Sequence, residues 1–176
     1  MRPVSVTVSS AANSAWIPLS NKQTPFNVSL GVTLDNAASG ITYSVQHTFD
    51  QLGNKQYPAS ITRSGTVATV TLTAHGLRVG DSVIVAAAGA PLDGTYAVAS
   101  VVDANTFTYT VANSGATAAS PGAWLIPLRV FNHDVLAGKV VSAQDNYAFP
   151  ITAVRLSLSA WGAGSATLTV TQCGVP

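Results

Sequence analysis

The sequence contains no glutamate, and only 9% of its 176 residues are charged. Soluble domains usually carry about 25% charged residues. The low value predicts either a surface covered by partners or one coated with serine, threonine and asparagine. All seven acidic residues are aspartates. Aspartate favours turns and glutamate favours helices, so the missing glutamate argues against amphipathic helices.

Other absences narrow the classes of function. The single cysteine, Cys173, excludes an intrachain disulfide. The basic residues are scattered singly and the net charge is +1, so the clustered basic surface that binds nucleic acid is missing. No apolar run is long enough to span a membrane, and the N-terminus lacks the continuous apolar stretch of a signal peptide. We therefore expect a chain made in a cytoplasm, with neither nucleic acid nor membrane as a partner.

Strand-like alternation of apolar and polar residues recurs near both ends of the chain. Alternation with a period of two is expected of half-buried antiparallel strands. The predicted strands are Val4–Ser9, Phe26–Val32, Thr42–Phe49, Val154–Ser159 and Ala166–Thr171. A broken strand over Leu125–Phe131 contains Pro127, which predicts an edge or a bulge. Residues 133–148 are the one place where a short helical turn is expected.

A β-rich cassette, Val67–Ala112, interrupts this pattern. Its short strand-like runs are separated by glycine and Asp-Gly turns, and His75-Gly76-Leu77 has the character of a turn. Loop-like stretches rich in glycine and proline flank it at residues 53–58 and 113–122. We therefore predict an all-β fold, with an antiparallel β-sandwich or jelly-roll-like host domain (1–58 plus 122–176) and a small inserted β-barrel-like module (59–121).

A search for catalytic chemistry finds no consistent constellation. The three histidines, His47, His75 and His133, lack the spacing of metal ligands, and no nucleophile motif accompanies them. His47 falls on the apolar register of its strand, which favours a core or interface role over that of a base. We predict no catalytic residues, no metal site and no cofactor.

Three tryptophans are the remaining candidate binding residues. An exposed aromatic ring stacks on sugars or anchors a protein interface. A buried ring that closes the end of a sandwich is the simpler interpretation for each of them. The three are Trp16, Trp124 and Trp161.

Several short segments resemble small virion structural proteins of tailed bacteriophages. The segments are Trp16–Leu19, Pro25–Val28, Tyr43–Asp50, Phe149–Leu156 and Gly164–Gln172. The cassette is similar to a β module that recurs in phage structural proteins, through its H-G-L, V-G-D, L-D-G-T-Y and T-F-T-Y elements. This resemblance implies a sandwich or jelly roll on the capsid, neck or tail, without catalytic residues.

These observations favour a non-enzymatic virion protein. The first hypothesis is a capsid decoration (cement) protein that bridges subunits of the major capsid protein and stabilises the head. The alternatives are a neck, tail or fibre component, and a glycan-binding β module. Because few charges protect its sheet edges, we also expect a homo-oligomer, with a trimer as the favoured state.

Overall fold

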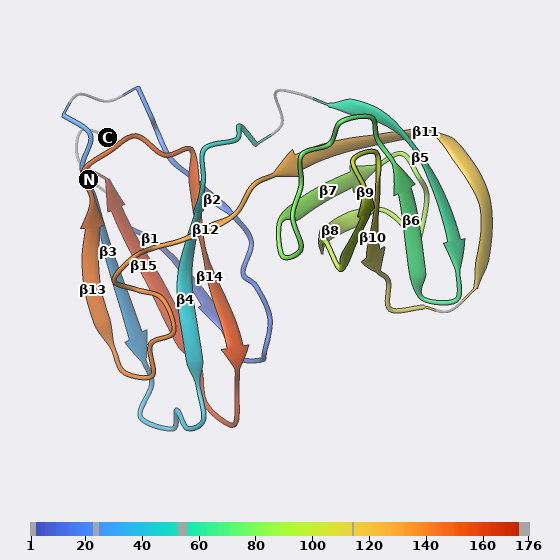
Figure 1. Ribbon diagram of the computed structural model, residues 1–176. Helices are drawn as coiled ribbons and strands as arrows, with labels where there is room; N and C mark the ends of the chain where they lie inside the picture. Colours follow the sequence, from blue (N-terminus) through green and yellow to red (C-terminus); the bar gives the residue numbers. More distant parts are fainter. Residues whose placement is uncertain (1–2, 23–24, 53–55, 114, 173–176) are drawn as a thin grey trace. The chain divides into compact units, whose positions relative to one another are not determined.

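The computed structural model describes residues 3–22, 25–52, 56–113 and 115–172, with the side chains of 116–122 left out. This part of the chain forms strands and turns and contains no helix, and its strands pair antiparallel, which confirms the all-β class. The chain divides into unit 1 (Met1–Phe49 and Phe131–Pro176) and unit 2 (Asp50–Val130) (Figure 1). No helix that is long and apolar enough to cross a membrane is found in the described residues.

Unit 1 contains two four-stranded sheets. One has the order β1 (Val4–Val8), β15 (Ala166–Gln172), β3 (Val28–Leu34), β13 (Ala143–Tyr147). The other has the order β12 (Phe131–Asn132), β4 (Thr42–Thr48), β14 (Ala153–Ala160), β2 (Ile17–Pro18). When these eight strands are counted along the chain without unit 2, the sheets read 1-8-3-6 and 5-4-7-2, which is the strand order of a jelly roll. Unit 2 fills the connection between the fourth and fifth strands, β4 and β12.

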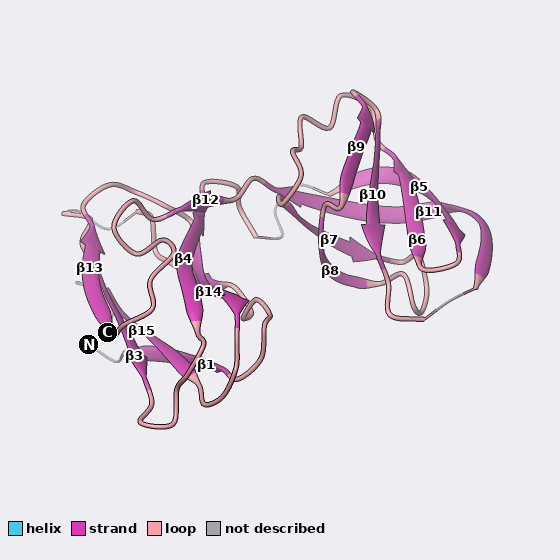
Figure 2. Ribbon diagram, turned by 60° about the horizontal axis from the view of Figure 1, so that its bottom comes forward, coloured by secondary structure: helices cyan, strands magenta, loops and turns pink. Residues whose placement is uncertain are grey.

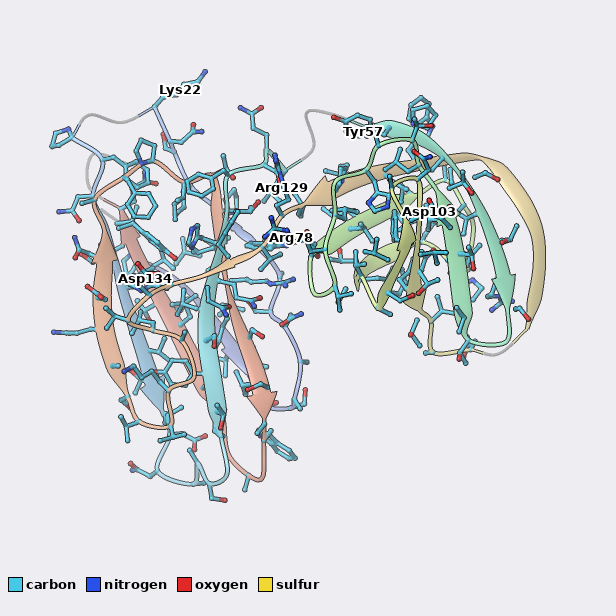
Figure 3. All side chains as sticks on the ribbon, viewed as in Figure 1. Lys22, Tyr57, Arg78, Asp103, Arg129 and Asp134 are labelled. Atoms are coloured by element: carbon cyan, nitrogen blue, oxygen red, sulfur yellow. The ribbon has the colours of Figure 1, made fainter. Side chains whose placement is uncertain are left out.

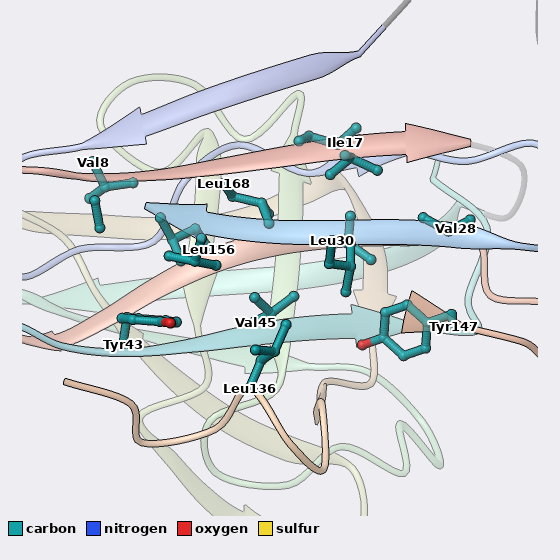
Figure 4. Close-up of a cluster of buried hydrophobic side chains, with 14 of the residues drawn as sticks. Val8, Ile17, Val28, Leu30, Tyr43, Val45, Leu136, Tyr147, Leu156 and Leu168 are labelled. Carbon is teal, nitrogen blue, oxygen red and sulfur yellow. The ribbon is translucent and has the colours of Figure 1, made fainter. Parts of the chain in front are cut away.

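The core of unit 1 lies between the two sheets (Figure 4). Alternate residues of β3 are buried, and so are Tyr43 and Val45 of β4. Leu156 of β14 and Leu168 of β15 are also fully buried. Burial of one such leucine contributes about 1.5–3 kcal/mol. The apolar side chains that alternate along the strands therefore stabilise the packing of the two sheets.

Unit 2 is a closed six-stranded barrel with its own core (Figure 2). Seven strands build it in the described part of the chain: β5 (Tyr57–Ser64), β6 (Val67–Thr71), β7 (Ser82–Ala86), β8 (Gly94–Ala97), β9 (Ser100–Asp103), β10 (Thr106–Thr110) and β11 (Ala116–Leu128). Their order is β8-β7-β11-β5-β6-β10-β9, and β8 and β9 count as one bent strand of the barrel.

The barrel closes because β8 and β9, at the two ends of the strand order, are joined by only two residues. Only Val98 and Ala99 separate β8 from β9, so these two act as one bent strand that pairs with β7 through its first half and with β10 through its second. The Ala99 amide donates to Thr108 O at 2.8 Å. Inside, the rings of Tyr96 and Tyr109 stack with centroids 4.4 Å apart. Closure removes most unpaired sheet edges from this unit.

The predicted boundaries of the insert need correction. The junctions expected at 58/59 and 121/122 fall inside β5 and β11, and unit 2 runs from Asp50 to Val130. The sequence around 113–122 is rich in small residues and was expected to be a loop. Residues 116–122 instead form the first half of β11, where register shifts against β5 interrupt the ladder between Thr117 and Ala123. Such bulges accommodate Pro121 and Gly122 within a strand.

Three further expectations are tested by the described residues. Pro127 lies in β11 opposite Val83 of β7, beyond the last residue of β11 that pairs with β5. At Pro127, β11 therefore has a partner strand on one side only, as expected for an edge. The helical turn expected within 133–148 is absent, because this segment runs beside β4 and then forms β13. The turn at His75 is confirmed: its Nδ1 accepts from the Leu77 amide at 3.0 Å. Cys173 lies outside the described residues.

Candidate functional site: an aromatic cluster at one end of the sandwich

The three tryptophans predicted as binding residues lie in separate settings. Trp161 is 41% exposed in the turn after β14, and its Nε1 donates to Gly164 O at 2.8 Å. Trp124 is 43% exposed and lies on β11. The predicted division placed Trp124 in the host domain, but the structure places it in unit 2.

Trp16 is unsuited to stacking on a ligand. It is half-buried just before β2, and the guanidinium carbon of Arg155 lies 4.5 Å from its ring centroid. Arg155 in turn donates from Nε to Gln46 Oε1 at 2.9 Å. Burial lowers the pKa of Arg155 to about 10, so it keeps its charge at neutral pH and holds a cation–π contact with the indole.

A larger aromatic feature comes from three pairs of residues spaced two apart. The pairs are His47 with Phe49, Phe131 with His133, and Tyr147 with Phe149. They lie at the ends of β4 and β13 and on and just after β12. Residues two apart in an extended chain share a face, so each pair points to one side. We call these six residues the aromatic cluster.

The rings of the aromatic cluster are in continuous contact. The ring centroid of Phe131 lies 5.7 Å from that of His47 and 5.6 Å from that of Phe49. Phe149 lies 6.2 Å from Phe49 and 5.4 Å from Tyr147. These are the stacked and edge-to-face separations at which aromatic pairs attract one another.

The cluster has an exposed layer and a buried layer. Phe49, Phe131 and Phe149 are 49%, 43% and 48% exposed, and we call them the phenylalanine patch. Beneath them, His47, His133 and Tyr147 are buried; Figure 4 shows Tyr147 near the end of the sandwich core.

Hydrogen bonds organise the buried layer. The Tyr147 hydroxyl and His47 Nδ1 lie 2.8 Å apart. Nδ1 of His133 accepts from the Val135 and Leu136 amides at 3.2 and 3.3 Å. Nε2 of His133 is buried and has no hydrogen-bond partner among the described residues. The ring centroids of His133 and Tyr147 lie 4.6 Å apart. A buried polar atom without a partner costs free energy.

Burial favours the neutral forms of His47 and Tyr147. Burial lowers the pKa of His47, His133 lowers it further, and Asp134 opposes both. Burial raises the pKa of Tyr147, and Asp134 and Asp145 raise it further. The Tyr147–His47 pair is therefore favoured in its neutral form. The described residues contain no group of three metal-ligating side chains that could hold a metal ion.

Two aspartates, Asp50 and Asp81, accept hydrogen bonds from residues near the C-terminal end of unit 2. Asp50 accepts from the Arg129 backbone amide at 2.7 Å and forms a salt bridge with its guanidinium at 2.6 Å, where β11 has ended (Figure 3). Burial raises the pKa of Asp50, but the hydrogen bonds and charge of Arg129 outweigh it and lower the pKa overall. Asp81 accepts from the Arg78 and Val130 amides at 2.7 and 2.9 Å.

Sequence reasoning assigned His47 to a core or interface role and did not identify the aromatic cluster as a site. The repeated aromatic-x-aromatic spacing was the available signal. Each pair alone is common in β proteins, however, and the three pairs are separated by long stretches of chain. Only strand pairing brings them together, with Phe131 opposite His47 in the β12–β4 register.

The comparisons with known proteins are limited. No protein family model and no curated protein matches the chain. Among solved structures, the chain is similar to the phage phi92 endosialidase, with 24% identity and a TM-score of 0.32. The match covers 68% of this chain and 14% of that protein. A likeness at this TM-score supports no conclusion about the fold or activity of this chain.

Proposed function

We propose that the chain is a non-enzymatic structural protein of a tailed-bacteriophage particle, and that it decorates the capsid by binding across major capsid protein subunits. The observation that carries the proposal is the jelly-roll strand order of unit 1, with a separate barrel in its β4–β12 connection. Jelly rolls build many viral coat and lectin domains. The sequence resemblance to phage virion proteins points to the coat rather than the lectin role.

The mechanism follows from repetition. A decoration protein binds a lattice that repeats the same site many times, so modest contacts combine into tight attachment. The scattered charges of this chain suit contacts made through polar and apolar surfaces. The attached protein then resists the outward pressure of packaged DNA by joining neighbouring capsid subunits.

The copy number of the chain in purified particles tests this proposal. Quantitative mass spectrometry against the major capsid protein gives the ratio directly. A ratio near one per lattice site supports capsid decoration. A much smaller ratio moves the chain to the neck, tail or fibres, which is the alternative within the same class. Absence from the particles overturns the virion assignment.

A second candidate function is glycan binding, which the exposed indoles of Trp161 and Trp124 favour. An indole face stacks on the apolar face of a sugar ring. The test is a glycan array probed with the purified chain, with the Trp161→Ala and Trp124→Ala variants beside it. Binding that one of these variants loses supports the glycan function, and silence across a broad array removes it.

Self-association is part of the proposal. β1 is an edge strand of unit 1 and carries no charged residue to discourage pairing with another chain. We assign a homo-oligomer, with a trimer as the expected state. Sedimentation equilibrium at micromolar concentration measures the mass, and the mass of one chain contradicts this assignment.

A further inference from the structure

The phenylalanine patch is an apolar surface without a cover among the described residues of unit 1. Its three rings are between 43% and 49% exposed, and they contact each other or the rings beneath them. Scattered single apolar residues on a surface need no explanation, but contiguous exposed aromatic rings mark interaction sites. Aromatic anchors of this kind dominate the binding energy of protein interfaces.

Two aspartates, Asp134 and Asp145, lie close in sequence to residues of the aromatic cluster. Asp134 follows His133 directly and is exposed. Asp145 precedes Tyr147 by two residues on the same strand, so the two side chains share a face. Both carboxylates act on the Tyr147 hydroxyl, which places them within electrostatic reach of the aromatic cluster. Arg129, two residues before Phe131, forms a salt bridge with Asp50, the residue after Phe49, so its charge is balanced by that carboxylate.

We infer that the phenylalanine patch docks a segment of a partner protein that presents apolar side chains flanked by lysine or arginine. The apolar side chains cover the three rings, and the basic side chains meet Asp134 and Asp145. This inference rests on the proposed structural role, for which it supplies an attachment site and the chemistry of the partner.

The same features disfavour other occupants. A second copy of this patch brings Asp134 and Asp145 close to their own equivalents, and like charges at an interface oppose association. A nucleic acid is disfavoured because its phosphates would repel the same carboxylates.

Two short peptides test the inference on the full chain. One is a seven-residue acetylated, amidated peptide that alternates lysine and leucine, and the other replaces each lysine with glutamate. Binding is followed by the fluorescence anisotropy of a dye on the peptide and by the NMR signals of the phenylalanine rings. We expect the lysine peptide to bind and shift the signals of Phe49, Phe131 and Phe149. The glutamate peptide is expected to bind at least about tenfold more weakly, a difference of about 1.4 kcal/mol.

Variants locate the binding. Phe131→Ser and, independently, Phe149→Ser are expected to weaken binding of the lysine peptide about tenfold, as for an interface anchor. Asp134→Asn is expected to weaken it about threefold and to reduce its salt dependence. The matched control is Trp161→Ser, which removes an aromatic ring of similar exposure elsewhere on unit 1. The control should change the affinity less than twofold. Circular dichroism checks that each variant is folded.

Three results overturn the inference: equal binding of the two peptides, no binding of the lysine peptide, or affinities that neither phenylalanine variant changes. Self-association of the chain that Phe131→Ser abolishes also overturns it, because a second copy then occupies the patch. The copy-number experiment is separate. A chain that is absent from particles and still binds the lysine peptide through the patch removes the proposed function alone, and a virion protein that fails the peptide test removes only this inference.

Discussion

At the scale of single residues, the chain keeps several polar groups inside its cores and satisfies most of them with specific partners. Asp81 is buried and accepts two backbone amides, and Arg155 is buried between Trp16 and Gln46. His47 is the titratable case, because its neutral form is the one that the buried layer accommodates. The stability of unit 1 should therefore depend on pH in the range where histidine titrates.

The sign of that dependence follows from the lowered pKa of His47. Its value in the unfolded chain is near 6.5, and the folded value lies below this. As the pH falls through 6.5, the unfolded chain binds a proton before the folded chain does. The contribution of neutral His47 to stability is therefore complete above about pH 6.5 and is lost progressively as the pH falls toward the folded pKa.

We expect the thermal midpoint of unit 1 to fall between about pH 6.5 and 5, and His47→Gln to flatten this slope. Differential scanning calorimetry across this range measures it. His75→Gln is the control, because His75 lies in unit 2 and its loss should leave the slope of unit 1 unchanged. An identical slope in the wild type and in His47→Gln would show that His47 is not the responsible group.

At the scale of elements, turns and strand ends decide how unit 1 closes. The turn between β14 and β15 packs tightly on the turn after β3. Gly164 has φ +78°, and a Cβ on it would lie 2.6 Å from the backbone nitrogen of Ala38. Glycine is needed there for both its left-handed conformation and its lack of a side chain.

Gly164→Ala is expected to destabilise unit 1 by about 2–5 kcal/mol, from the left-handed backbone together with the collision. Gly138→Ala is the matched control: Gly138 has φ +63° but open space around its Cβ position. The control should cost only about 1–2 kcal/mol. Urea unfolding followed by tryptophan fluorescence measures both. Equal losses would mean that the close approach at Gly164 has no effect.

Element-scale prediction from sequence succeeded where alternation was clean and failed where small residues dominated. The strand Val4–Val8 was predicted to within one residue, because valine occupies every second position. The first half of β11 was assigned to a loop, because alanine, serine, glycine and proline carry little strand preference of their own. This segment forms a strand because its backbone pairs with β5, which its own residue types do not predict.

At the scale of the whole molecule, a closed barrel occupies one strand connection of a jelly roll. The chain passes from unit 1 into unit 2 after Phe49 and returns to unit 1 at Phe131. The ring centroids of these two residues lie 5.6 Å apart. Unit 2 begins at Asp50 and ends at Val130. Arg129 donates to the Asp50 carboxylate near these ends, and the Val130 amide donates to Asp81. Close chain ends are the condition under which one domain tolerates another inside it.

We therefore expect each unit to fold alone. Replacing residues 50–130 with Asn-Gly leaves a four-residue connection, Thr48-Phe49-Asn-Gly, between His47 and Phe131, which already pair, so β4 and β12 can form a hairpin. Residues 50–130 expressed separately should form the barrel. Circular dichroism and NMR dispersion measure folding of both. The comparison is the shorter fragment 59–121, which lacks the second half of β11 and should be unfolded; a folded 59–121 fragment would refute the boundaries assigned to unit 2.

The sequence by itself determined the class of structure. Period-two alternation states which face of each strand is buried, and the missing glutamate disfavours helices. Tertiary structure alone decided which strands are neighbours, where the insert begins and ends, and which aromatic residues meet. The Tyr147 hydroxyl bonds to a histidine 100 residues away. No local pattern encodes such a contact, because alternation specifies a strand's buried face and not its partner, and the partner is chosen by the packing of the whole sandwich.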